Sequence, residues 1–260
     1  MSEGGAPVLI TIDPGTGTGT ITLNRPPLNI LDIATLRALG DAIDEVVERA
    51  GCAIVILRAA GGKAFCAGAE VGDHVPEKAP EMLDAFHRVA RRLSGMDAVS
   101  VAAVQGAALG AGFELAMCCD LIVASDSANF GLPEINLGCF PPIAAAALPG
   151  RIGRHRAAEV VLTGRRFSAA EAVTMGLVTR QVDAEFFDAE VAALLGELQT
   201  KSRSALKVAV SVLRRAASQP FDAALSMAEK AYVEELLPLE DAREGILAFI
   251  EKRKPRWEHR

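Results

Sequence analysis

The sequence predicts an α/β protein whose C-terminal part is helical, and three observations support this fold class. Apolar runs rich in β-branched residues alternate with segments of helical periodicity along most of the chain. The last part of the chain shows helical patterns only. Half of the 260 residues are hydrophobic but only 5% are aromatic, so aliphatic side chains must fill the interior. We therefore expect an α/β core over residues 1–200 and a helical region over residues 201–260.

The chain begins with two predicted strands that form a hairpin. Residues 8–12 (VLITI) and 18–24 (TGTITLN) are β-rich and flank the turn sequence DPGTG. The glycines of PGTGTGT lack the GxGxxG and GK[ST] spacings of nucleotide loops, so we interpret this segment as a hairpin turn. Residues 33–47 then carry apolar side chains at helical spacing, which predicts a helix.

Two segments of the predicted core resemble each other. Residues 53–58 (AIVILR) form a buried strand that leads into a glycine-rich loop, and residues 99–104 (VSVAAV) lead into QGAALGAG. A helix at about 80–95 separates them, with Met82 and Phe86 on its apolar face. Such self-similarity indicates stacked supersecondary units. Each turn has small residues, so its backbone N–H groups are accessible to a ligand.

The remaining elements follow from the same patterns. We expect strands at residues 121–125 and 178–182. Predicted helices cover residues 156–163, 168–175, 185–199, 203–217, 221–236 and 239–253.

Composition excludes several classes of protein. No apolar run reaches the 18 or so residues of a membrane helix, and the N-terminus shows no basic region followed by an apolar one, so we expect neither a membrane span nor a secretion signal. The cysteines are odd in number and lack CxxC spacing, which argues against a disulfide framework and against a zinc or other metal site. They are expected to be small buried residues in the reducing cytoplasm: Cys52, Cys66, Cys118, Cys119 and Cys139.

Charge is distributed unevenly along the chain. The net charge of −6 argues against nucleic acid as a partner. The last ten residues, EKRKPRWEHR, nevertheless carry five Lys/Arg against two Glu. Such a basic tail is either a solvated helix end or a contact for phosphate groups, and the charge pattern leaves both alternatives open.

Two glutamates lie in otherwise apolar segments. Glu114 lies within GAGFELAMCCD, where Gly110 and Gly112 precede a predicted helix, so it would occupy the first turn. It could simply complement the positive end of that helix. Glu134 lies within FGLPEINLG, between Pro133 and an apolar stretch. Two half-buried carboxyl groups suit general acid–base chemistry, because their environments can keep one protonated and the other ionised. Two unrelated glutamates remain the alternative.

Four motifs in order resemble the enoyl-CoA hydratase/isomerase (crotonase) superfamily. They are KAFCAGAE, GAALGAGFELAMCCDLIVAS, ANFGLPEINLG and EGILAFIEKR, and the resemblance runs over nearly the whole chain. It implies the crotonase (ClpP/crotonase-like) spiral of ββα units, followed by a helical region that forms trimers, often paired into hexamers. It also implies an acyl-CoA thioester as substrate, with coenzyme A as part of that substrate and no separate cofactor.

The resemblance further implies roles for individual residues. The backbone N–H groups of Ala69 and Ala111 would form the oxyanion hole for the thioester carbonyl, and Glu114 and Glu134 would be the catalytic glutamates. Here Ala111 replaces the middle glycine of the usual Gly-Gly-Gly turn, but every residue except proline keeps the N–H. Contacts with coenzyme A are implied for a last set of residues: Lys63, Ala67 and, from a neighbouring subunit, Phe249 and Lys252.

The presence of both glutamates favours hydration, since many family members keep only one of them. Residues 23–31 (LNRPPLNIL) and LGCFPPIAAAALPG depart from the common hydratase pattern and resemble a branch of the family that hydrates a cyclic dienoyl-CoA. Pro141 and Pro142 would stiffen an apolar slot for a flat ring. The alternatives are a general short-chain enoyl-CoA hydratase, an enoyl-CoA isomerase, or a non-catalytic scaffold or RNA-binding protein of the same fold.

Overall fold

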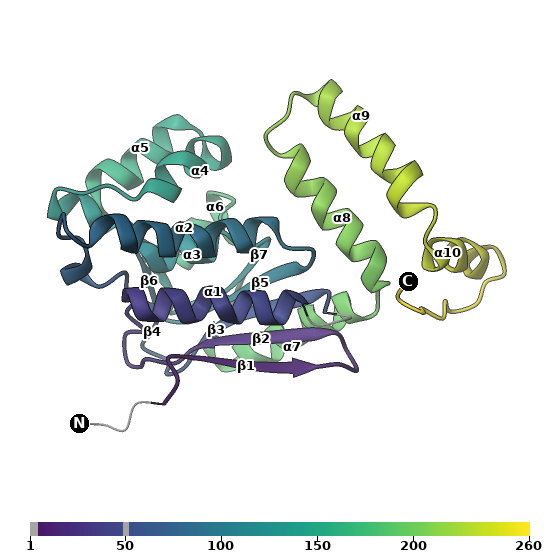
Figure 1. The fold of residues 1–260 in the computed structure, drawn as a ribbon, viewed down its shortest axis with the longest axis horizontal. Coiled ribbons are helices and arrows are strands. Elements are labelled where there is room, and N and C mark those ends of the chain that lie inside the picture. The colour runs from purple at the N-terminus through teal and green to yellow at the C-terminus, as the bar shows by residue number, and fades with distance from the viewer. Residues whose placement is uncertain (1–4, 49–51) are drawn as a thin grey trace.

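Two β-sheets form the body of the molecule in the computed structural model, which describes residues 5–48 and 52–260 (Figure 1). The larger sheet has the strand order β1-β2-β3-β5-β7-β10 and the smaller one β4-β6-β8-β9. The expectation of no secretion signal concerns the N-terminus, of which residues 1–4 lie outside the described part. The strands of the larger sheet are β1 (Val8–Asp13), β2 (Thr18–Leu23), β3 (Ile54–Ala59), β5 (Val99–Val104), β7 (Leu121–Ser125) and β10 (Arg180–Val182).

The N-terminal hairpin has the predicted position. Strands β1 and β2 are antiparallel, with Val8 opposite Leu23 and Asp13 opposite Thr18. The Asp13 carboxylate accepts the N–H of Gly15 at 2.9 Å, and the Asp13 carbonyl accepts the N–H of Gly17 at 2.9 Å. These bonds close the turn within the chain itself, as expected for an Asp that precedes glycines. The interpretation as a hairpin turn is therefore confirmed.

The smaller sheet shows that the chain repeats one unit. Its strands are β4 (Ala64–Cys66), β6 (Ala107–Leu109), β8 (Asn129–Gly131) and β9 (Arg166–Ser168). Each of β3, β5 and β7 in the larger sheet is followed by a strand of the smaller sheet, and β3–β5–β7 and β4–β6–β8 are parallel. The predicted stacking of ββ units is confirmed. The glycine-rich loop predicted after residues 53–58 is wrong at Ala64–Cys66, because a three-residue strand is too short to show a periodicity.

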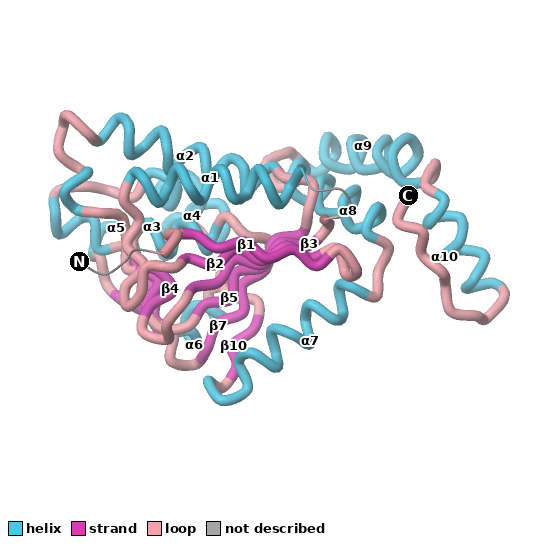
Figure 2. The backbone as a smooth tube through the Cα atoms, turned by 60° about the horizontal axis from the view of Figure 1, so that its bottom comes forward, coloured by secondary structure: helices cyan, strands magenta, loops and turns pink. Residues whose placement is uncertain are grey.

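Helices cover both faces of the larger sheet. Helices α1 (Ile33–Glu48) and α2 (Ala79–Gly95) lie side by side on one face, where the main apolar core lies. Helix α7 (Phe187–Gln199) lies on the other face, as Figure 2 shows. It buries Phe187, Val191 and Leu194 against strands β3, β5 and β7. Because both faces are covered, the central strands are apolar on both sides.

The segment between the strands contains one helix that the sequence patterns missed. Helix α3 (Ala111–Met117) and helix α5 (Arg154–Thr163) correspond to predicted elements, as does α6 (Ala169–Thr174). Helix α4 (Pro142–Ile152), however, was read only as a stiff apolar wall. Proline at the first helical position is a start signal, because its missing N–H is not needed there. That signal was available in the sequence.

The C-terminal helices extend away from the body (Figure 1). They are α8 (Arg203–Ala216), α9 (Phe221–Ala231) and α10 (Glu240–Ile250), and the predicted division at residue 200 falls between α7 and α8. The helix predicted over residues 221–236 changes to a π-helical turn at Tyr232–Leu236, and the last helix ends three residues before its predicted end. The Arg214 guanidinium fastens α8 to the body through Asp120 at 2.6 Å and the carbonyl of Ala98 at 2.9 Å.

Three general expectations can be compared with the described residues. Over residues 5–48 and 52–260, no helix has the length and apolar content that a membrane span requires. No cluster of His, Cys, Asp and Glu in this part of the chain could hold a metal ion. All cysteines are free thiols, and Cys52, Cys66, Cys118 and Cys119 are buried as expected. Cys139 is only half-buried, so the expectation of burial was wrong for this residue.

Candidate active site

A cavity of about 410 Å³ lies beside helix α2, next to the smaller sheet and the start of helix α3. Its walls come from the segment after β4, from the N-terminus of α3, and from the segment that follows β8. Most of its surface is apolar, and the apolar side chains larger than alanine at its walls are Val71, Met82, Leu83, Phe86, Pro133, Leu137, Phe140, Pro141 and Pro142. Among these apolar walls lie both glutamates predicted from the sequence.

Glu114 lies at the bottom of the cavity, in the first turn of α3 as predicted. Only 2% of its surface is exposed. Its Oε1 accepts the backbone N–H of Ala144 at 2.8 Å, a donor that the N-terminal turn of helix α4 presents. A buried carboxyl group must have such a donor, because an unsatisfied one would be costly. The missed helix α4 therefore orients Glu114.

Burial changes the acidity of Glu114. Loss of hydration raises its pKa to about 7, the N–H of Ala144 opposes the rise, and the nearby charge of Glu134 adds to it. A carboxyl group with this pKa is a mixture of acid and carboxylate at neutral pH. It can therefore donate or accept a proton, as general acid–base chemistry requires.

Glu134 lies across the cavity in a 3₁₀ turn, Pro133–Leu137, that follows β8. It is half-buried, and its Oε2 is buried without a hydrogen-bond partner among the described residues. Burial raises the pKa of this carboxyl group, whereas its own backbone and the charge of His74 oppose the rise. An unpartnered buried oxygen in a cavity is available to a ligand or a water molecule.

Gly110 lets the Glu134 carboxylate approach the start of α3. The residue has φ 53°, a left-handed conformation that favours glycine. A Cβ atom at this position would lie 2.5 Å from Oε1 of Glu134. Glycine is needed at position 112 for a different reason, because a Cβ there would overlap the backbone carbonyl of Cys66 in β4. The two glycines thus place α3 against β4 and against Glu134.

The predicted oxyanion residues lie on two neighbouring units of the repeat, and both line the cavity. Ala69 forms a parallel bridge with Leu31, in which Gly68 accepts and Glu70 donates the hydrogen bonds. The N–H of Ala69 therefore points away from Leu31. The N–H of Ala111 belongs to the first residue of a helix and has no acceptor within that helix. Neither N–H has a backbone acceptor among the described residues.

The residues expected to contact coenzyme A are not gathered in one place. Ala67 lines the cavity beside Ala69, and its N–H donates to Leu28 at 2.9 Å. Lys63 is exposed in the turn before β4 and does not line the cavity. Phe249, at 86% exposure, and Lys252 lie at the far end of α10, away from the body (Figure 1). A single chain therefore does not bring these two residues to the glutamates.

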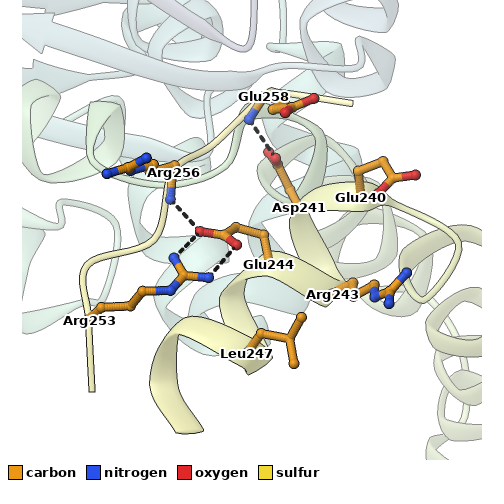
Figure 3. Close-up of a pocket in the computed structure, with 8 residues that line it drawn as sticks. All are labelled: Glu240, Asp241, Arg243, Glu244, Leu247, Arg253, Arg256 and Glu258. Carbon is orange, nitrogen blue, oxygen red and sulfur yellow. Dashed lines mark hydrogen bonds and ion pairs between the residues drawn. The ribbon is translucent and has the colours of Figure 1, made fainter. Parts of the chain in front are cut away.

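A second cavity, of about 560 Å³, lies between α10 and the C-terminal tail. Figure 3 shows Glu244 held by the guanidinium of Arg253, at 2.6 and 2.8 Å, and by the N–H of Arg256. The N–H of Glu258 donates to Asp241. The carboxylates of Glu244 and Asp241 thus accept hydrogen bonds from the tail, so fewer polar groups of this cavity are free for chemistry. Of the basic residues in the tail, Arg253 is therefore paired within the chain.

Sequence reasoning missed three contributors to the site. His74 lines the cavity, Ala144 supplies the donor to Glu114, and Gly110 makes room for Glu134. Pro142 could have revealed the helix that carries Ala144. No sequence pattern placed His74 near Glu134, because the two are 60 positions apart and meet only through the fold.

Comparisons with known proteins show which proteins this chain resembles. Residues 14–260 match the model of a family described as enoyl-CoA hydratase/isomerase. The chain is 35% identical to the cyclohexa-1,5-dienecarbonyl-CoA hydratase of Thauera aromatica over an alignment that covers all of both chains. It is 32% identical to the crotonyl-CoA hydratase of Syntrophomonas wolfei, over 89% of this chain and 91% of that one.

Solved structures also resemble this chain over nearly their whole length. The enoyl-CoA hydratase of Mycobacterium smegmatis superposes with a TM-score of 0.91 at 32% identity, covering 97% of this chain and 99% of that one. The enoyl-CoA hydratase of Bacillus anthracis gives a TM-score of 0.90 at 32% identity, covering 96% and 99% of the two chains.

Proposed function

Because the chain belongs to the enoyl-CoA hydratase/isomerase family, as its motifs predicted, and is an enzyme of the hydro-lyase type, we propose that it adds water to an α,β-unsaturated acyl-CoA thioester in the cavity between Glu114 and Glu134. One observation carries this proposal. Two carboxyl groups with raised pKa values face the same apolar cavity, in which two backbone N–H groups have no backbone acceptor within residues 5–48 and 52–260. Each element has a distinct task in the reaction.

The N–H groups of Ala69 and Ala111 would bind the thioester oxygen. Addition of water to the double bond passes through an enolate-like state in which negative charge grows on that oxygen. Two fixed donors in a site that excludes water stabilise this charge, and removal of one such donor typically costs about 10²–10³ in rate. The donors are backbone groups of two parallel units, so the fold itself fixes their direction.

The two glutamates would handle the protons. A carboxylate takes a proton from water, and the resulting hydroxide oxygen forms a bond with the β-carbon. A carboxylic acid delivers a proton to the α-carbon. At the end of the step, the glutamate that was ionised carries the proton and the other glutamate is ionised. The pair must therefore hold one proton at the start, which suits a Glu114 pKa of about 7.

We further propose that the acyl group is a cyclic dienoyl group. The relative from Thauera aromatica is named for such a substrate, and the similarity spans the whole chain. The cavity walls include Phe86, Pro141 and Pro142, which give a stiff apolar slot suited to a flat ring. A short-chain enoyl-CoA is the second candidate, supported by the similarity to a crotonyl-CoA hydratase.

The C-terminal helices would form the contact between subunits. The exposed apolar side chains on α8 to α10 and their connections are Leu213, Phe221, Leu225, Tyr232, Val233, Leu237, Ile246, Leu247, Phe249 and Ile250. This much exposed apolar surface is typical of an interface. We propose a trimer, or a pair of trimers, in which Phe249 and Lys252 of one subunit contact the coenzyme A bound to its neighbour.

An absorbance assay tests the function. The purified chain should hydrate cyclohexa-1,5-diene-1-carbonyl-CoA, crotonyl-CoA, or both, seen as loss of the absorbance of the conjugated thioester. A kcat/KM at least tenfold higher for the cyclic substrate supports the dienoyl proposal, and the reverse ranking supports the short-chain alternative. Absence of turnover with every member of a panel of unsaturated thioesters would favour the non-catalytic alternative instead.

A further inference from the structure

The cavity contains an unusual balance of charges. The titratable side chains among its described lining residues are Glu114, Glu134, Cys139 and His74. No lysine or arginine of the described residues lines it. His74 is thus the one group in this lining that can carry a positive charge beside two carboxyl groups. Because the inference concerns these groups, it rests on the proposed function of the same site.

A hydrogen bond within its own segment orients the His74 ring. His74 directly follows a 3₁₀ turn, Val71–Asp73, and its backbone N–H donates to the carbonyl of Val71 at 3.1 Å. The ring Nδ1 lies 3.0 Å from the carbonyl oxygen of Glu70. A carbonyl oxygen only accepts, so Nδ1 must carry a hydrogen. This assigns the tautomer and leaves Nε2 as the ring nitrogen without that bond.

The segment that carries His74 is fastened on two sides. Asp73 is buried, and its Oδ2 accepts the N–H of Ile33, the first residue of α1, at 3.2 Å. Its Oδ1 receives a hydrogen bond from Lys78 at 3.2 Å. The N–H of Glu70 donates to Leu31 at 3.0 Å. The imidazole therefore stands on a braced segment, and its place at the cavity does not depend on a free loop.

Glu134 is the carboxyl group of the pair that has no donor to one of its oxygens in the described part of the chain. Its Oε2 is buried without a hydrogen bond among the described residues, and its other oxygen lies against Gly110. Glu114, by contrast, has the N–H of Ala144. Burial raises the pKa of Glu134, its own backbone lowers it, and the charge of His74 also lowers it. The other titratable groups facing it are Glu114 on α3 and Cys139 on its own segment.

We propose that His74 is a positioning residue for Glu134: its imidazolium, oriented by the Glu70 carbonyl, stabilises the ionised Glu134 carboxylate and thereby directs the single proton of the glutamate pair to Glu114 in the substrate-free site. No bond forms or breaks in this role. The role needs the charged imidazolium, and His74 is the one side chain among the described lining residues that can supply a positive charge. The division of one proton between two carboxyl groups then follows from one cation placed near one of them.

The test uses the full chain in its substrate-free form. Glutamates labelled with ¹³C at Cδ are titrated by NMR, and the Glu114→Gln and Glu134→Gln variants identify the two signals. His74→Asn keeps a side-chain N–H for the Glu70 carbonyl but removes the charge. We expect it to raise the titration midpoint of Glu134 by about one pH unit, as loss of a nearby opposite charge does. His74→Lys, which keeps a positive charge, should return the midpoint toward the original value.

Activity provides a second readout. His74→Asn should lower kcat about tenfold near the midpoint of Glu134 while KM changes less than about twofold, and His74→Lys should recover most of the loss. Circular dichroism must show an intact fold, and His74→Gln replaces His74→Asn if the latter does not fold. An unchanged Glu134 midpoint in the folded neutral variant overturns the proposal. The NMR result stands even if no thioester is hydrated, so failure here and failure of the proposed function are distinct.

Discussion

Gly110 lies against the carboxylate of Glu134 so closely that a Cβ atom at position 110 would lie 2.5 Å from Oε1. The same residue has φ 53° and ends the turn that leads from β6 into α3. Its position therefore joins the two segments that carry the glutamates. Loss of the glycine would displace a carboxylate that has few other contacts, since its Oε2 has no hydrogen-bond partner among the described residues.

Gly110→Ala should lower kcat by about 10², because a catalytic group displaced by about 1 Å loses much of its effect. Gly176→Ala is the matched control: Gly176 also has a positive φ, of 75°, but no atom of the described residues lies within 4 Å of its Cβ position. Both variants should lose about 1 kcal/mol of stability, and only Gly110→Ala should lose turnover. Steady-state kinetics and thermal unfolding measure the two effects. Equal kcat values in the two variants would contradict the explanation.

Glu114→Gln and Glu134→Gln should each reduce kcat by at least about 10², since a positioned acid or base contributes about 10²–10⁴. Glutamine keeps the shape of the side chain but cannot exchange a proton. Glu190→Gln, on the exposed surface of α7, is the control and should keep full activity. Single-turnover kinetics separates the chemical step from binding of the thioester, which should change little. Turnover near the original value in either active-site variant would refute the use of two carboxyl groups.

Glu114 should make stability depend on pH in a defined direction. Its pKa rises from 4.5 in the unfolded chain to about 7 in the fold, so the folded state prefers the protonated form. Ionisation of Glu114 therefore does not lower the free energy of unfolding below pH 4.5. It lowers this free energy increasingly from pH 4.5 to 7 and has its full effect above pH 7. That effect is about 3 kcal/mol at most.

Glu114→Gln removes this ionisation and should stabilise the chain relative to the original at pH 8 but not at pH 4.5. Urea unfolding at the two pH values measures the difference, at a fixed protein concentration because assembly also affects stability. A difference between variant and original that is the same at both pH values would show that burial does not disfavour the Glu114 carboxylate.

Ala111→Gly should retain activity, whereas Ala111→Pro should abolish it. The proposed role belongs to the backbone N–H, which glycine keeps and proline lacks. Ala111 is the first residue of α3, where proline is sterically compatible with a helix, so we expect the fold to be kept. Circular dichroism checks this before activity is compared. An inactive, folded Ala111→Gly variant would instead assign the function to the methyl group.

Lys252→Ala should weaken binding of coenzyme A without loss of assembly, and more so at low salt, where exposed charges are least screened. Lys252 is exposed and has no ion-pair partner among the described residues, in contrast to Arg253. Lys254→Ala, a change of a nearby exposed lysine, is the control. Deletion of residues 240–260 should disturb assembly and coenzyme A binding together. Light scattering that detects a fully active monomer would exclude a site shared between subunits.

Much of this architecture could be predicted from local patterns. The hairpin, the long strands and helices α1, α2, α7 and α8 each span enough residues for a periodicity to appear. Strands β4, β6 and β9 have three residues each, so no repeat could show. Helix α4 was missed although Pro142 marks its start, and the π-helical turn at Tyr232–Leu236 interrupts a pattern that is continuous in the sequence. Local propensity cannot reveal a change imposed by packing.

The sequence by itself determined the family and the α/β class and singled out the two glutamates as candidates, because each is expressed in short motifs that can be recognised without contacts. Only the tertiary structure decided how those glutamates differ. Helix α4 brings the N–H of Ala144 to Glu114, and the segment after β4 brings His74 to the cavity that Glu134 lines. The physical reason is that acidity depends on burial and on neighbouring charges, and both arise from segments distant in the sequence.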